Sequence, residues 1–145
     1  LINKNLTISF AESCTGGLLG HRTTQVEGSS KAFKGGMVVY SNEAKVDQLK
    51  ISQELLDQFG AVSQEVALKM AKNVRDVFSS DIGVSVTGIA GPGGGTDNKP
   101  VGLVYVGYSD SKAVDTYQFN FHSNRRTNKI RTSQSVFNLI LKNIS

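Results

Sequence analysis

The feature that most constrains this chain is the alternation of short apolar runs with helical patterns, in a sequence with 15 glycines and only two prolines. Such alternation is typical of α/β domains, in which helices cover both faces of a sheet. The order of the elements predicts one domain over residues 1–145, a three-layer α/β/α sandwich with a mixed sheet. Strands are expected at 7–11, 37–40, 82–87, 101–108 and 116–121. Helices are expected at 18–24, 42–49, 53–59, 64–78 and 126–142.

The last part of the chain predicts a hairpin followed by an amphipathic helix. The runs 101–108 and 116–121 both alternate with a period of two and flank a short polar connection at 110–112. In the following helix the apolar residues recur at helical spacing, so we expect one side to face the core. The inward side chains are expected to be Ile130, Phe137, Ile140 and Leu141.

Composition excludes several classes of protein. Apolar residues make up 39% and charged residues 19% of the chain, which is within the range of globular domains. No apolar run approaches the roughly 18 residues that a membrane span needs. Cys14 is the only cysteine, so neither an internal disulfide nor a cysteine-built zinc site is possible. With only two histidines as well, we expect a cytoplasmic protein with no membrane contact, no metal and no cofactor.

The net charge of +4 comes entirely from the end of the chain. Residues 1–115 hold eleven Lys/Arg against twelve Asp/Glu, whereas residues 116–145 hold five bases and no acid. A patch this small suits one phosphate group better than a nucleic-acid duplex, so we expect no direct nucleic-acid binding. A solvated basic helix face is the simpler alternative. The five bases are Arg125, Arg126, Lys129, Arg131 and Lys142.

The segment 11–17, Ala-Glu-Ser-Cys-Thr-Gly-Gly, places a serine between a strand and a helix. The arrangement follows the logic of a nucleophile elbow, although Gly-x-Ser-x-Gly is absent. Two adjacent glycines allow backbone N–H groups to approach an oxyanion. Ser13 and Cys14 are rival nucleophiles, and a strand would point them to opposite faces. Because cysteine is among the most buried residue types, we assign Cys14 to packing and Ser13 to the site. A serine turn that merely caps the helix is the alternative.

The segment 40–45 brings a tyrosine and a lysine together at the start of a helix. The helix dipole opposes a cation there, and a desolvated pocket disfavours the charged amine, so we expect the pKa of Lys45 to be lowered. A lysine close to neutrality can accept the proton of a serine hydroxyl, and Tyr40 is placed to orient either group. The alternative is a surface lysine beside a core tyrosine. His21 and His122 have no acid at a diagnostic spacing, so no Ser-His-Asp triad is predicted.

A long glycine-rich loop joins two strands at 88–100 and lacks the Gly-Lys-Ser/Thr of a phosphate-binding P-loop. Together with other stretches it resembles the CinA C-terminal domain family, also known as nicotinamide mononucleotide (NMN) deamidases. The resemblance is gap-free within each stretch over residues 11–102 and loose beyond them. The stretches are AESCTGG (11–17), GSS (28–30), FKGGMVVYSNEAK (33–45), GAVSQEVA (60–67) and TGIAGPGGGTDNKPVG (87–102).

The resemblance implies an α/β domain that hydrolyses the carboxamide of NMN to nicotinic acid mononucleotide and ammonia, without metal or cofactor. It implies Ser13 as nucleophile, Lys45 as base and Tyr40 as their assistant. It also suggests a homodimer or larger assembly, with NMN as the small-molecule partner. Substrate-binding residues are expected at Thr15, Gly16, Gly17, Asn42, Thr87, Gly88, Ile89, Ala90, Gly91 and Arg125.

The chain departs from the family pattern at 121–131, where the usual Gly-Asp-Arg is missing. Arg125 aligns with the first family arginine, and either Lys129 or Arg131 takes the position of the later one. The departure leaves open which base faces the phosphate. A second hypothesis is a catalytically inactive, CinA-like binding module for a competence or DNA-damage partner. The intact Ser13, Tyr40 and Lys45 favour the enzyme.

Overall fold

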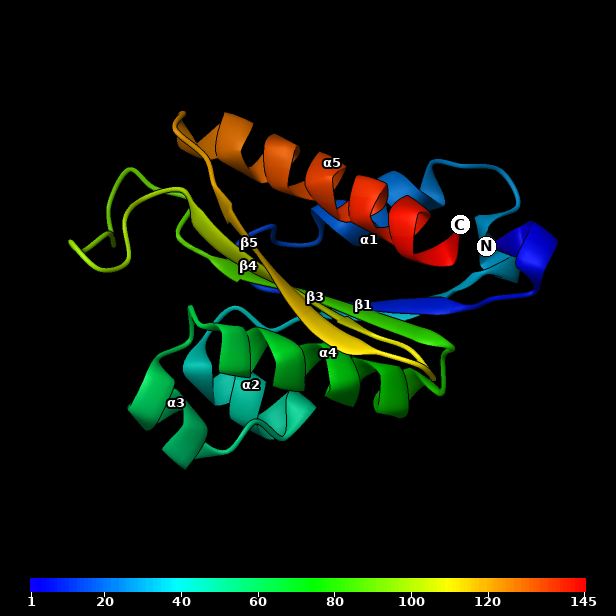
Figure 1. Cartoon of the computed structure of the whole chain (residues 1–145), viewed down its shortest axis with the longest axis horizontal. Coiled ribbons are helices and arrows are strands. Elements are labelled where there is room, and N and C mark those ends of the chain that lie inside the picture. The colour runs from blue at the N-terminus through cyan, green and yellow to red at the C-terminus, as the bar shows by residue number, and fades with distance from the viewer.

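Five strands form one sheet in the order β2-β1-β3-β4-β5 in the computed structural model, which describes residues 1–145 (Figure 1). The strands are β1 (Ile8–Glu12), β2 (Phe33–Val38), β3 (Ile82–Gly88), β4 (Leu103–Ser109) and β5 (Val114–Asn120). The helices are α1 (Leu18–Thr24), α2 (Asn42–Leu49), α3 (Gln53–Phe59), α4 (Gln64–Phe78) and α5 (Arg125–Ile144). None of these helices is both long enough and apolar enough to cross a bilayer.

The helices cover both faces of the sheet. Figure 1 shows α1 and α5 on one face and α2, α3 and α4 on the other. Each face has its own apolar core: Phe10 and Val136 belong to the cluster beneath α5, and Met70 and Leu49 to the cluster beneath α4. The predicted three-layer α/β/α sandwich is therefore confirmed.

The strand directions bring three strand ends together at one edge of the sheet. β1 runs parallel to both β2 and β3, whereas β4 and β5 are antiparallel to their neighbours, so the predicted mixed sheet and the predicted hairpin are confirmed. The carboxyl ends of β2, β1 and β3 therefore lie side by side. β2 lies on one side of β1 in the sheet and β3 lies on the other side, so the strand order reverses at β1. Open α/β sheets commonly bind ligands outside the carboxyl ends of the strands at such a reversal.

Two glycines let α4 lie close against the sheet. A Cβ atom at Gly83 would collide with the carbonyl of Ala71, and one at Gly107 with the carbonyl of Ala67. Between them the Ser85 hydroxyl donates a hydrogen bond to the Ala67 carbonyl. Small residues in β3 and β4 thus set the distance between this helix and the strands.

The prediction for the second strand was wrong in its bounds. β2 begins at Phe33 and ends at Val38, so the glycine pair lies inside the strand instead of leading into it. Parallel pairing with β1 decides this, because it runs from Ile8 opposite Phe33 to Glu12 opposite Val38. The ring of Phe78 fills the space where a side chain at Gly35 would stand.

The prediction for the final helix was wrong in part of its buried face. Ile130 and Leu141 are 48% and 60% exposed, whereas Ile140 is buried as expected. The buried stripe begins with polar residues instead, including Asn128 and Thr132. These can be buried because hydrogen bonds satisfy most of their polar atoms: Asn128 donates to Ala90 and Ser123 carbonyls, and Thr132 donates to the Asn128 carbonyl.

Candidate active site

A cleft of about 170 Å³ opens at the carboxyl ends of the three parallel strands. Residues from β1, β2 and β3 ends, from the start of α2 and from the start of α5 meet there. The lining residues are Ser13, Cys14, Tyr40, Asn42, Lys45, Ala61, Val62, Thr87, Gly88, Ala90 and Arg125.

Ser13 and Lys45 form the polar centre of this cleft. Ser13 follows the end of β1, where its N–H donates to the Val86 carbonyl at 3.0 Å. Lys45 lies one turn into α2 and is only 1% exposed. Its Nζ lies 3.1 Å from Ser13 Oγ, 2.9 Å from the Val39 carbonyl and 3.1 Å from the Tyr40 carbonyl. The amine is therefore held by two carbonyl oxygens with the serine hydroxyl as its third neighbour.

This geometry suits a lysine base. Burial lowers the pKa of the Lys45 ammonium, because the charged form loses its hydration. Of the two causes that the sequence suggested, desolvation and the helix start, desolvation by burial is the largest cause here. A neutral amine donates its two N–H bonds to the Val39 and Tyr40 carbonyls, which leaves its lone pair for the proton of Ser13.

Cys14 also borders the cleft but is poorly suited to attack. Burial raises the pKa of its thiol to about 12, so little thiolate forms at neutral pH. Its side chain belongs to the apolar core, which agrees with a packing role. The expected alternation of Ser13 and Cys14 does not apply, because β1 ends at Glu12 and both residues lie in the turn that follows.

The backbone of that turn offers two unengaged donors. The N–H groups of Gly16 and Gly17 are taken, by the Ser13 carbonyl and the Glu12 carboxylate respectively. The N–H groups of Cys14 and Thr15 donate to no other residue of the protein. Of the N–H groups of Thr15, Gly16 and Gly17, only that of Thr15 is therefore unengaged, and the adjacent glycines that suggested an oxyanion site are themselves paired.

Glu12 is the residue of this region that the sequence analysis passed over. Its carboxylate is 3% exposed and accepts four hydrogen bonds from the turn and from the first residues of α1. The available signal was an acid ahead of a helix N-terminus, where a carboxylate satisfies unpaired N–H groups.

Tyr40 and Arg125 meet at the mouth of the cleft. Tyr40 follows β2 and is 59% exposed, and its hydroxyl accepts a hydrogen bond from Arg125 Nη2 at 3.0 Å. Arg125 is the first residue of α5, and its Nη1 donates to the Gly91 carbonyl at 2.8 Å. The Tyr40 hydroxyl makes no hydrogen bond with Ser13 or Lys45. The guanidinium thus links the end of β2 to the glycine-rich loop.

Some of the remaining expected binding residues line the cleft, and others do not. Asn42, Thr87, Gly88 and Ala90 line the cleft, and the Thr87 hydroxyl donates to the carbonyl of Ala61. Thr15, Gly16, Gly17, Ile89 and Gly91 do not line it. Ala61 and Val62, which the sequence analysis did not identify, form its apolar wall.

Among the other bases of α5, Lys129 lies nearest to the site. A Cβ atom at Gly16 would stand 3.6 Å from Lys129 Nζ, so this ammonium is close to the turn that carries Ser13. Arg126 and Arg131 are exposed and do not line the cleft.

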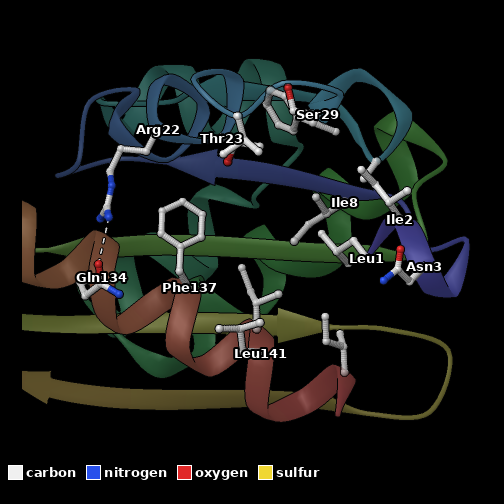
Figure 2. A pocket seen from close by; sticks show the side chains of 15 residues that line it. Leu1, Ile2, Asn3, Ile8, Arg22, Thr23, Ser29, Gln134, Phe137 and Leu141 are labelled. Atoms are coloured by element: carbon white, nitrogen blue, oxygen red, sulfur yellow. Dashed lines mark hydrogen bonds between the residues drawn. The ribbon is translucent and has the colours of Figure 1, made fainter.

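A larger cavity of about 590 Å³ lies elsewhere, between α1, α5 and the start of β1 (Figure 2). Its lining is mostly apolar, with Leu1, Ile8 and Phe137 among the side chains in view. Arg22 lies at its border and is held by hydrogen bonds to Ser133 Oγ and Gln134 Oε1. The cavity has no carboxylate, histidine or lysine in its lining, so the smaller cleft is the candidate active site.

No three His, Cys, Asp or Glu side chains come together as a metal site would require. His21 and His122 are exposed and lie outside the lining of the cleft.

The sequence profile of the CinA C-terminal domain matches residues 1–144. The chain belongs to the CinA C-terminal domain family. It is 52% identical over 126 residues to a CinA-like protein of Gloeothece citriformis, covering 86% of this chain and 30% of that protein. It is 45% identical over 144 residues to a CinA-like protein of Endomicrobium trichonymphae, covering 99% of this chain and 34% of that protein. The chain thus spans about a third of the length of the curated relatives it matches.

Solved structures of CinA-family proteins share the fold. The competence damage-inducible protein A of Klebsiella pneumoniae superposes with a TM-score of 0.96 at 27% identity, covering 99% of this chain and 89% of that one. The competence/damage inducible protein CihA of Agrobacterium tumefaciens superposes with a TM-score of 0.94 at 37% identity, covering 97% of this chain and 87% of that one.

Proposed function

We propose that this CinA-family domain is a serine-dependent amidohydrolase that converts NMN to nicotinic acid mononucleotide and ammonia. The observation that supports it most is the buried Lys45 Nζ, 3.1 Å from Ser13 Oγ and held by two carbonyls. An activated serine is the requirement of such a reaction, and a desolvated lysine is one of the few bases that can activate it. The substrate is taken from the family that the sequence resembles.

The proposed reaction begins with attack of Ser13 Oγ on the carboxamide carbon while Lys45 Nζ accepts the hydroxyl proton. The carbonyl oxygen becomes an oxyanion that accepts hydrogen bonds from the unengaged N–H groups that follow Ser13, of which Cys14 lines the cleft. The Lys45 ammonium then returns its proton to the leaving nitrogen, the C–N bond breaks and ammonia departs. Water attacks the resulting Ser13 ester with Lys45 again as base, which releases the carboxylic acid and restores the serine.

Size and charge agree with a nucleotide that enters ring first. A cleft of about 170 Å³ is smaller than the roughly 300–1,000 Å³ of sites that enclose a whole ligand. It suits the pyridine carboxamide, with the ribose phosphate left at the mouth. Arg125 lies at that mouth, at the positive N-terminal end of α5, and both features favour a phosphate.

The proposal is tested by incubating the purified protein with NMN and measuring ammonia and nicotinic acid mononucleotide. Both products are expected in equal amounts from the wild type and neither from Ser13→Ala. Absence of both products from a folded wild-type protein would contradict the proposal.

The names of the solved relatives, which refer to competence and damage, favour a second candidate, a binding module without catalysis. The same assay separates the two, because a binding module releases no ammonia. Its affinity for a partner would also be unaffected by Ser13→Ala, which removes only one oxygen atom.

A further inference from the structure

We infer that Glu12 is a positioning residue for catalysis, which holds the nucleophile turn, defined as residues 13–17, and selects the N–H groups that stay available for the oxyanion. The inference rests on the proposed function and extends it to a residue whose carboxylate makes a hydrogen bond to neither Ser13 Oγ nor Lys45 Nζ. Glu12 ends β1, and its own carbonyl accepts the N–H of Val39 at 2.8 Å. Its backbone is thereby fixed between the two strand ends that carry the site.

The carboxylate reaches across the whole turn. Glu12 Oε2 accepts hydrogen bonds from Thr15 Oγ1 at 2.7 Å and from the N–H groups of Gly17 and Leu19 at 3.0 Å each. Glu12 Oε1 accepts the N–H of Gly20 at 2.9 Å. The contacts close a ring from the end of β1 to the first turn of α1, with Ser13 inside it.

Capping alone does not require so costly a group. A carboxylate buried to this extent is unfavourable unless every lone pair is satisfied. Here four donors and the positive end of α1 supply that compensation. A neutral serine, threonine or asparagine at the cap position would serve a seven-residue helix, yet the cap of α1 is Gly17, which has no side chain.

The ring of hydrogen bonds around Glu12 determines which backbone N–H groups remain free to donate. By accepting the N–H groups of Gly17, Leu19 and Gly20, Glu12 fixes the chain so that those of Cys14 and Thr15 stay unengaged beside the serine. An oxyanion hole needs donors that are already oriented and not otherwise paired. Loss of the ring is therefore expected to lower the rate of the chemical step while leaving the remote parts of the substrate bound.

The decisive variant is Glu12→Gln, which keeps the size but replaces one acceptor oxygen with an NH2 donor. Each carboxylate oxygen faces N–H groups, so either orientation of the amide sets donor against donor. We expect kcat for NMN to fall about 100-fold with KM changed less than about three-fold, as for a lost oxyanion contact. Labelling of Ser13 by a fluorophosphonate probe, followed by mass spectrometry, is expected to slow about as much.

A second pair of variants tests the inference even if Glu12→Gln does not fold. Thr15→Val removes one donor to the carboxylate with little change in shape, and Thr15→Ser restores it. We expect kcat to fall about ten-fold in Thr15→Val and to recover in Thr15→Ser. A matched control is Asp81→Asn, because Asp81 accepts hydrogen bonds from Thr7 N and Thr7 Oγ1 just before the other end of β1.

Wild-type kcat and labelling rates in both Glu12→Gln and Thr15→Val would overturn the inference. The inference would also be overturned if the losses of rate were equal to those of Asp81→Asn. The same holds if a smaller fraction of folded protein accounts for the whole loss. A wild-type protein that releases no ammonia from NMN would contradict the proposed function alone. In that case the labelling rate of Ser13 still decides the role of Glu12, because the probe does not depend on the natural substrate.

Discussion

Lys45 Nζ lies 3.1 Å from Ser13 Oγ although 32 positions separate the two residues. The parallel pairing of β1 and β2 brings them together, since the Glu12 carbonyl accepts the Val39 N–H where both strands end. Ser41 then caps α2 by accepting the N–H of Ala44, which starts the helix where Lys45 points back to the serine. The proximity of nucleophile and base is thus a consequence of strand register and helix capping.

The identity of the nucleophile is tested by two neighbouring substitutions. Ser13→Ala is expected to lower kcat for NMN by about 10³-fold or more, because no covalent intermediate can form. Cys14→Ala is expected to keep most of the activity, because its buried thiol has a pKa raised to about 12. Ammonia release by the purified variants is the measurement. An active Ser13→Ala beside an inactive Cys14→Ala would reverse the assignment.

The role of Lys45 as base is tested by Lys45→Arg. Arginine keeps the positive charge but cannot lose its proton in this pH range, so the variant is expected to be as inactive as Lys45→Met. In the wild type, kcat/KM is expected to rise with pH along one limb, because burial lowers the pKa of Lys45 from its ordinary value of about 10.4 and the neutral form is the base. Activity in Lys45→Arg would show that the residue supplies only charge.

The same pKa shift predicts a change in stability with pH. The folded-state pKa of Lys45 is lowered, so between it and the ordinary value the unfolded chain binds more protons and stability rises with pH. Lys45→Met lacks this contribution. We therefore expect the free energy of unfolding of the wild type to increase relative to Lys45→Met as the pH is raised from 7 to 10. Denaturant titrations at several pH values measure this, and a constant difference would mean that the folded-state pKa is not lowered.

Recognition of the phosphate by Arg125 is tested with two substrates. Arg125→Ala is expected to lower kcat/KM for NMN about ten-fold or more, since a charge-assisted hydrogen bond to phosphate is lost. The rate with nicotinamide riboside, which has no phosphate, is expected to change little. Arg126→Ala is the control, because that side chain is exposed and does not line the cleft. Equal losses on both substrates would assign Arg125 to the fold or to the chemistry, through its contacts with Tyr40 and Gly91.

Sequence patterns alone were enough to predict the layer architecture and most of the helices. Local signals suffice there: Ser63 caps α4 by accepting the N–H of Val66, and the apolar spacing that follows has only one face to bury. The sequence also singled out Ser13, Tyr40 and Lys45, because a serine that follows a strand and a lysine in the first turn of a helix have a chemical use. Local patterns did not reveal that Ile130 and Leu141 would be exposed, since the buried polar stripe of α5 depends on hydrogen bonds to other segments.

The assembly of the site depends on contacts between segments that are far apart in the sequence. The lowered pKa of Lys45 follows from burial by neighbouring elements, and the link from Arg125 to Tyr40 joins residues 85 positions apart. The role of Glu12 likewise depends on a turn that folds back on its carboxylate, so that Gly17 donates inwards while Cys14 and Thr15 do not. Residue types and spacing indicate which groups can react. Their protonation and their free hydrogen-bond donors are properties of the packed chain, because burial and pairing exist only after the strands and helices have met.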